Sequence, residues 1–199
     1  MVERLRKMGI CDDAVLTAMS KVPRHKFISE ALGFQAYDEK ALPIGHGQTI
    51  SHPYTVARMT ELLTVNPGDK ILEIGTGSGY QAAVLCELQA HVYSVEIKKP
   101  LADKSAKLLT ELGYRTAVRY GDGTKGWKAY APYKAIIVTA GALLVPENLL
   151  DQVEINGKLL IPIGKGDKQK LIMYIRTKKG FEEQVYEEFQ FVPFLSGSR

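Results

Sequence analysis

Residues 71–79 read Ile-Leu-Glu-Ile-Gly-Thr-Gly-Ser-Gly and lead directly into Tyr80-Gln81-Ala82-Ala83. The apolar run that ends at Ile74 predicts a strand, and the apolar residues that follow at helical spacing predict a helix. Three glycines at alternate positions between them allow a tight turn in which the backbone approaches a ligand closely. Because a helix start presents unpaired N–H groups, this strand, turn and helix predict a site for a nucleotide-like cofactor.

The spacing of the glycines distinguishes between two kinds of nucleotide site. The dinucleotide-binding fingerprint has its third glycine three positions after the second, and Tyr80 stands at that position here. The acidic Glu73 followed by Gly-x-Gly-x-Gly instead resembles the first motif of the class I S-adenosylmethionine-dependent methyltransferases. On this stretch alone, an ordinary strand-to-helix turn in a parallel sheet, without a bound ligand, remains an alternative.

Composition indicates one globular domain over residues 1–199, with 45% hydrophobic and 24% charged residues. The net charge of +4 is small and demands no nucleic-acid partner. Cys11 and Cys86 lie far apart without a CxxC pair, which suits a reducing cytosol and indicates neither a disulfide framework nor a metal site. With no secretory signal and no apolar run near ~18 residues, we expect a soluble, cytoplasmic monomer without a membrane partner.

Acidic residues follow the next two predicted strands. Glu96 ends the strand over 91–95, 21 residues after Gly75, where nucleotide-binding folds place a carboxylate that accepts hydrogen bonds from ribose hydroxyls. Asp122 lies between two glycines after the strand over 116–120, at the same sheet edge, and is a candidate acceptor for an adenine amino group. The alternatives are a solvated strand-end glutamate and a turn aspartate.

The rest of the chain completes an α/β pattern. Strands alternating with helices and closing in an antiparallel hairpin predict a doubly wound, mostly parallel sheet of six or seven strands, a Rossmann-like fold. The further helices are expected over 12–22, 52–63, 100–112 and 146–153, the further strands over 133–140 and 157–164, and the hairpin over 169–176 and 181–191.

A second informative stretch precedes the first long strand. Residues 41–54 contain a glycine-rich loop, expected to be flexible, and then the polar side chains of Gln48, Thr49, Ser51 and His52 just before a helix. Ser51 stands where a helix N-cap is expected, with Pro53 in the first turn. A capping serine can also line a site, so the two roles are compatible.

Several motifs together resemble the protein-L-isoaspartate O-methyltransferase family. Their order and spacing match from about Val22 to the end of the chain, and the Gln-Thr-Ile-Ser-x-Pro stretch is the most specific of them. Two departures are an Ala-Gly-Ala-Leu-Leu-Val-Pro segment over 140–146 and a short N-terminal helical region. The matching motifs are Gln48–Tyr54, Leu72–Tyr80, Gly121–Gly123, Gly157–Leu159 and Phe191–Phe194.

The resemblance implies methyl transfer from S-adenosylmethionine to the free α-carboxyl of L-isoaspartyl residues in damaged proteins and peptides. Such a carboxylate is already ionised at neutral pH, so the reaction needs no general base. Residues 1–50 are expected to contribute to the substrate site. The implied site residues are Ser51 as catalytic residue, Thr49, Ile50 and His52 toward substrate, and Gly75, Gly77, Ser78, Gly79, Glu96, Asp122 and Gly123 toward the cofactor.

Two other functions remain as alternatives. A class I methyltransferase acting on RNA or a small molecule would use the same cofactor pocket, although the charge is mild and no Asn-Pro-Pro-aromatic motif follows the fourth strand. A cofactor-binding module without catalysis would not need the polar run over 48–52. The sequence therefore favours the carboxyl methyltransferase.

Overall fold

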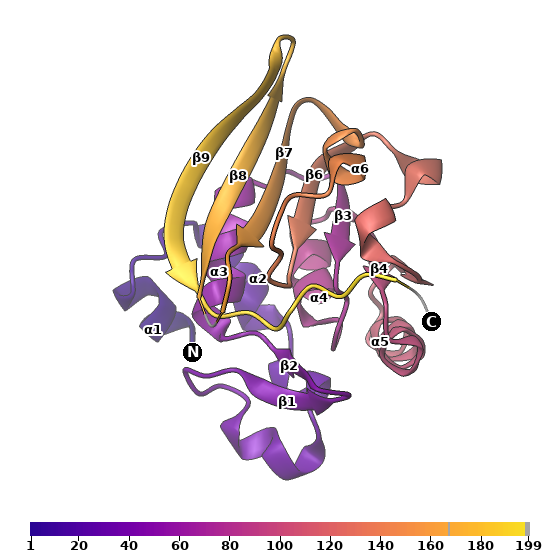
Figure 1. The fold of residues 1–199 in the computed structure, drawn as a ribbon. Coiled ribbons are helices and arrows are strands. Elements are labelled where there is room, and N and C mark those ends of the chain that lie inside the picture. Colours follow the sequence, from indigo (N-terminus) through magenta and orange to yellow (C-terminus); the bar gives the residue numbers. More distant parts are fainter. Residues whose placement is uncertain (167, 198–199) are drawn as a thin grey trace.

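The computed structural model describes residues 1–166 and 168–197 and has a twisted seven-stranded sheet at its centre (Figure 1). The strand order is β5-β4-β3-β6-β7-β8-β9, parallel from β5 to β7 and antiparallel from β7 to β9. The predicted doubly wound α/β class is confirmed. The strands are β3 (Lys70–Ile74), β4 (His91–Glu96), β5 (Thr116–Tyr120), β6 (Tyr133–Val138), β7 (Val153–Ile163), β8 (Gln169–Thr177) and β9 (Gly180–Phe189).

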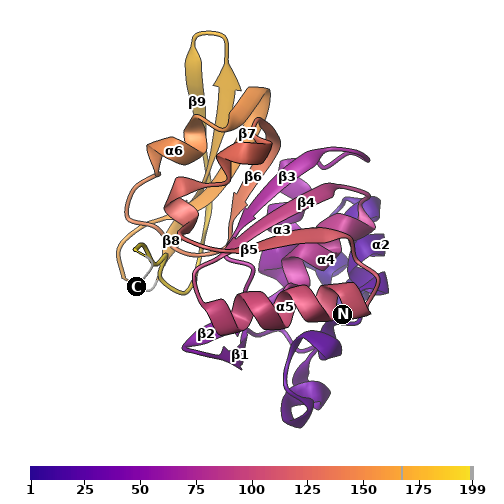
Figure 2. The same ribbon diagram turned by 90° about the vertical axis from the view of Figure 1, so that its right-hand side faces the viewer.

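Helices cover the sheet unequally, as the side view in Figure 2 shows. The longer helices pack along one face, and the other face carries the short α6 and the 3₁₀ turns that follow β5. The α-helices are α1 (Val2–Lys7), α2 (Asp13–Lys21), α3 (Pro53–Leu63), α4 (Tyr80–Glu87), α5 (Lys99–Glu111) and α6 (Glu147–Leu150). The 3₁₀ helices are η1 (Arg24–Phe27), η2 (Glu30–Gln35), η3 (Gly123–Lys125) and η4 (Lys128–Tyr130).

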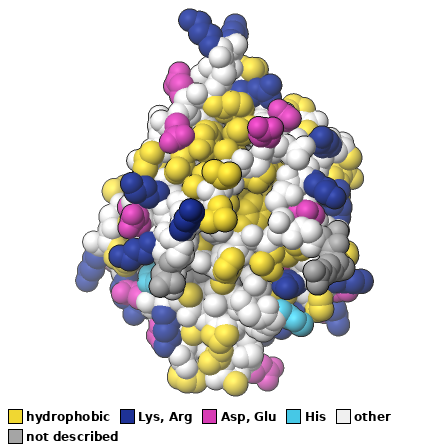
Figure 3. All heavy atoms as spheres, viewed as in Figure 1, with side chains coloured by type: hydrophobic (Ala, Val, Ile, Leu, Met, Phe, Trp, Pro, Cys, Tyr) yellow, Lys and Arg dark blue, Asp and Glu magenta, His cyan; other side chains and the backbone are white. Residues whose placement is uncertain are grey.

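The central strands are buried on both faces. Ile71 belongs to a hydrophobic cluster that includes residues of α2, α3 and α4, whereas its neighbour Leu72 belongs to a second cluster with Leu149 of α6. Successive side chains of a strand point to opposite faces, so one strand contributes to both cores. Figure 3 shows apolar side chains gathered on the viewed face over the β7–β8 side of the molecule.

The stretch before α3 differs from its prediction in two ways. The expected flexible loop is a short hairpin of β1 (Leu42–Gly45) and β2 (Gln48–Ile50), closed by a two-residue turn with positive φ at His46 and Gly47. The N-cap of α3 is His52 and not Ser51, because the His52 Nδ1 atom accepts the Tyr54 N–H at 3.0 Å. The prediction that Ser51 caps the helix was therefore wrong.

The other differences lie at element ends. The helix predicted over 146–153 is only α6, because β7 begins already at Val153 and extends the sheet beyond the predicted strand. The helix α1 was not predicted. The predictions for β3 and β5 match the structure, and α2 ends before Pro23 with Asp12 as its N-cap, as expected.

Candidate cofactor and acceptor site

A cavity of about 730 Å³, including its open mouth, lies at the carboxyl ends of β3, β4 and β6. This is the edge at which open α/β sheets bind ligands. The glycine turn, the β1–β2 hairpin and the C-terminal segment all contribute to it. Among its lining residues are Thr49, Ile50, Ser51, Gly75, Gly77, Ser78, Tyr80, Glu96, Gly123, Thr139, Val192 and Phe194.

The turn after β3 brings backbone close to the cavity. Gly75 has φ +96°, and a Cβ at this position would lie 2.6 Å from the Thr139 Oγ1 atom. The Thr139 hydroxyl donates to the Gly75 carbonyl at 2.7 Å, so β6 supports the turn from the side. Gly77 and Ser78 line the cavity, whereas Gly79 packs against Leu109 of α5 and does not line it. The turn can thus cradle a ligand with its backbone.

Glu96 is buried, and both of its carboxylate oxygens are held by backbone. Oε2 accepts the Gly77 N–H at 2.7 Å, and Oε1 accepts the Lys98 N–H at 2.8 Å. Each carboxylate oxygen has a second acceptor site. The side chain is therefore preoriented at the cavity wall with acceptor capacity for ligand hydroxyls.

Glu73 lies beneath the same turn, fully buried in a chain of short hydrogen bonds. Its Oε2 atom accepts the Ser94 hydroxyl at 2.5 Å, and Ser94 and Thr76 share a hydrogen bond of 2.5 Å. Burial raises the pKa of Glu73 to about 8; the hydrogen bond from Ser94 opposes this effect, and the negative charge of Glu96 adds to it. This environment favours the protonated form of the carboxyl group.

Asp122 is placed differently from its neighbour Gly123. Its Oδ1 atom accepts from the Thr124 N–H and hydroxyl, and its Oδ2 atom accepts the Gly197 N–H at 3.0 Å. Burial favours a higher pKa for Asp122, but these hydrogen bonds outweigh it and keep the pKa below its usual value. Gly123 lines the cavity, and a Cβ there would lie 2.4 Å from Ile74 Cγ2. Of these two residues, only Gly123 lines the cavity.

The predicted acceptor residues divide between two neighbouring cavities. Thr49, Ile50 and Ser51 line the cofactor cavity, whereas His52 lines a second cavity of about 1050 Å³, a volume that includes its open mouth. Thr49 lines both, so it lies in the wall between them. Burial lowers the pKa of His52, consistent with a neutral imidazole that accepts the hydrogen bond of the helix cap.

Sequence reasoning missed the C-terminal segment as part of the cavity. Val192 and Phe194 line it, and the backbone of this segment pairs with Gly141 through two hydrogen bonds of 2.8 Å. The Gln169 side chain also accepts the Phe191 N–H at 3.0 Å. The Phe-Val-Pro-Phe match was the only sequence signal, and the atypical segment at Gly141 serves as the anchor.

A model of the protein-L-isoaspartate(D-aspartate) O-methyltransferase family matches residues 1–199. The chain belongs to this family. A protein-L-isoaspartate O-methyltransferase of Pseudomonas paraeruginosa is 51% identical over 199 residues, covering 99% of this chain and 94% of the relative. The enzyme of the same name from Aliivibrio fischeri is 50% identical, covering 97% and 93%.

Solved structures of protein-L-isoaspartate O-methyltransferases share the whole architecture. One has a TM-score of 0.89 at 27% identity and covers 100% of this chain and 67% of its own. Another, from Plasmodium falciparum in complex with S-adenosyl-L-homocysteine, has a TM-score of 0.87 at 27% identity, covering 98% and 97%. The family uses S-adenosylmethionine, and the glycine turn and Glu96 of this chain suit such a cofactor.

Over residues 1–166 and 168–197, no group of three or more His, Cys, Asp or Glu side chains is placed to hold a metal ion. Within the same residues, no helix has the length and apolar character needed to cross a membrane.

Proposed function

We propose that this protein transfers a methyl group from S-adenosylmethionine to the free α-carboxyl of L-isoaspartyl residues in damaged proteins and peptides, which starts their repair to aspartate. The observation that carries the proposal is the placement of Thr49 and Ser51 in the same cavity as the glycine turn and Glu96. Two stretches some 25 residues apart in the sequence thereby provide an acceptor side and a cofactor side.

On the cofactor side, each group has a role that its geometry supports. The backbone of Gly75 and Gly77 approaches the methionine part of the ligand, and Ser78 lies next to them in the lining. Glu96 accepts from the ribose hydroxyls, and Gly123 meets the adenine, whereas the Asp122 carboxylate next to it is held by Thr124 and Gly197. Gly79 serves the turn itself, since it faces α5.

On the acceptor side, the hydroxyls of Thr49 and Ser51 donate to the substrate carboxylate and orient one oxygen toward the methyl group. When bound, the cofactor supplies this methyl group on a positively charged sulfur. No side chain has to remove a proton, because a carboxylate of ordinary pKa is ionised at neutral pH. Alignment and exclusion of water are the main tasks of the chain, and such positioning contributes roughly 7–11 kcal/mol in well-oriented systems.

The N-terminal residues 1–50 complete the acceptor side in this proposal. They supply the β1–β2 hairpin, and Ile50 and Thr49 at its end line the cavity. His52 lies next to the hairpin in the adjoining cavity, where it faces the chain on either side of the isoaspartyl residue. We further propose a cytoplasmic monomer that acts on polypeptides and not on nucleic acid, in keeping with the net charge of +4.

One labelling experiment tests the activity. The protein is supplied with S-adenosylmethionine tritiated in the methyl group and with matched isoaspartyl and aspartyl peptides. Label should enter only the isoaspartyl peptide and leave it as methanol in mild alkali, because the product is an ester. Label that resists alkali, or that enters RNA or a small molecule instead, would refute the proposed acceptor.

A further inference from the structure

Arg24, at the start of η1, is a buried cation without a balancing carboxylate. Its side chain is 0% exposed, and none of the ion pairs of residues 1–166 and 168–197 includes it. Burial lowers the pKa of Arg24, and the groups that oppose this effect are the phenols of Tyr80 and Tyr37. A guanidinium stays protonated in proteins, so an uncompensated positive charge lies inside the molecule.

This charge lies directly behind two walls of the cofactor and acceptor cavity. The Arg24 Nη2 atom donates to the backbone carbonyl of Ser51 at 2.6 Å, and the guanidinium carbon lies 4.6 Å from the centroid of the Tyr80 ring. Ser51 and Tyr80 both line the cavity. The Nε atom donates to the Ala36 carbonyl at 2.8 Å and fixes the plane of the guanidinium.

One donor of the guanidinium remains without a protein partner. The Nη1 atom is buried and has no hydrogen-bond partner among the described residues. Buried polar groups are nearly always paired, and isolated buried charges are costly. An arginine kept under these conditions, in contact with the peptide unit of the proposed catalytic serine, calls for a functional explanation.

We propose that Arg24 is a positioning residue that makes the acceptor site selective for a carboxylate. Its charge attracts the ionised α-carboxyl of the isoaspartyl residue across the Ser51 and Tyr80 walls, and its hydrogen bond holds the Ser51 peptide in place. Charges interact more strongly in a partly desolvated cavity than in water. The methyl ester formed by the reaction is neutral, so the same charge does not retain the product. This inference rests on the proposed function.

The test compares two peptides of identical sequence, one with the isoaspartyl α-carboxylate and one with the neutral α-carboxamide. Their affinities for the wild-type protein and for the variants R24M, R24Q and R24K are measured by calorimetry or by competition. In R24M and R24Q, the preference for the carboxylate should fall at least tenfold, a change of about 1.4 kcal/mol. In R24K, which keeps the charge, the preference should stay within about threefold of wild type. The Kd of S-adenosylmethionine should change less than about twofold.

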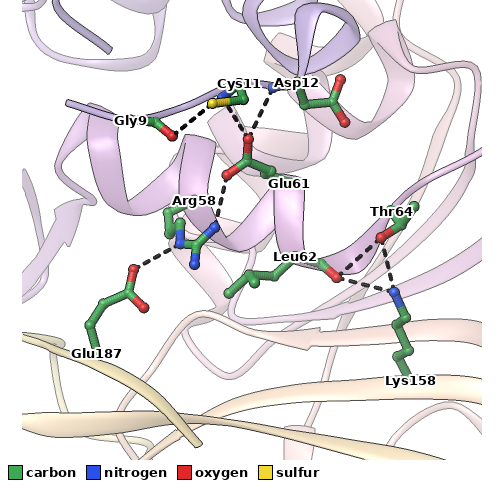
Figure 4. Close-up of polar contacts among 9 residues, drawn as sticks. All are labelled: Gly9, Cys11, Asp12, Arg58, Glu61, Leu62, Thr64, Lys158 and Glu187. Carbon is green, nitrogen blue, oxygen red and sulfur yellow. Dashed lines mark hydrogen bonds and ion pairs between the residues drawn. The ribbon is translucent and has the colours of Figure 1, made fainter. Parts of the chain in front are cut away.

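A matched control removes a different arginine. Arg58 on α3 is balanced by two carboxylates, since Nη1 lies 2.9 Å from Glu61 Oε2 and Nε lies 2.8 Å from Glu187 Oε1 (Figure 4). It does not line the cavity. The variant R58M should leave the carboxylate preference unchanged and lower the Tm, because Glu61 and Glu187 lose the cation that pairs with them.

The outcomes separate the inference from the proposed function. Wild-type protein that does not methylate the isoaspartyl peptide would refute the function, whatever the variants show. If the wild type is active and R24M and R24Q weaken both peptides equally, Arg24 is only structural and the inference is refuted. If R24M does not fold, the comparison of R24Q with R24K decides, because Gln keeps a donor for the Ser51 carbonyl and Lys keeps the charge.

Discussion

The substitution Glu73→Gln should remove a dependence of folding stability on pH. Burial raises the pKa of Glu73 from its ordinary value of 4.5 to about 8, so the folded state holds a proton that the unfolded state releases. The contribution of this proton to the free energy of unfolding is therefore complete below the pKa of the unfolded state and decreases as the pH rises toward 8. This contribution changes by 1.36 kcal/mol per pH unit, so the wild-type protein should lose about 3 kcal/mol of unfolding free energy over the 2.5 units from pH 4.5 to pH 7.

A neutral glutamine is nearly isosteric with the protonated acid, and the Ser94 hydroxyl can reverse its hydrogen bond to suit the amide. The difference in unfolding free energy, variant minus wild type, should therefore rise by about 1.4 kcal/mol per pH unit between pH 5 and 8 and level off above that range.

Urea denaturation at pH 5, 6, 7, 8 and 9, followed by circular dichroism, measures this difference. Glu111→Gln on the exposed side of α5 serves as the control and should give a nearly constant difference from wild type. Parallel pH curves for wild type and Glu73→Gln would refute the reasoning, because they would mean that Glu73 is ionised in the folded protein.

Further predictions concern the site. Ser51→Ala should lower kcat about 10- to 100-fold and keep the cofactor affinity, because it removes a hydrogen bond to a charged group. Glu96→Ala should instead weaken cofactor binding by a similar factor. Initial rates and calorimetry separate the two effects, and an equal loss of cofactor binding in both variants would show that Ser51 has only a structural role. Gly75→Ala should cost about 1–2 kcal/mol of stability in thermal unfolding, because of its φ of +96° and the Thr139 hydroxyl 2.6 Å from the new Cβ. Phe194→Ala should raise the Kd of S-adenosylmethionine with little change in Tm, and an unchanged Kd would show that the C-terminal segment does not contact the cofactor.

Local sequence patterns predicted those elements whose structure depends on residues that are neighbours in the chain. The apolar run into Gly75, and the position of Glu96 after the next strand, predicted β3, its turn and the sheet edge correctly, because strand and helix periods are local properties. The cap of α3 shows the limit. Serine is the commoner cap, but the turn geometry placed the His52 nitrogen within reach of the Tyr54 N–H instead.

Groups brought together from distant parts of the chain needed the tertiary structure. Asp122 suited adenine by sequence position, yet its carboxylate binds the Gly197 N–H from the other end of the chain. Arg24 stands beside His25 and Lys26 in the sequence, where no local pattern indicates burial, and folding buries it behind Ser51 and Tyr80. Burial and charge balance depend on what packs around a side chain, which no local pattern records.

The sequence by itself determined the kind of fold, the cofactor turn and the likeness to one family of carboxyl methyltransferases. The periodic spacing of apolar residues, the glycines over 75–79 and the polar run over 48–52 carry that information locally. Only the tertiary structure decided which of these residues share one cavity, which carboxyl group has a raised pKa and which buried cation forms no ion pair within residues 1–166 and 168–197. These properties arise from distances and desolvation between segments far apart in the chain, and both are set when the chain packs.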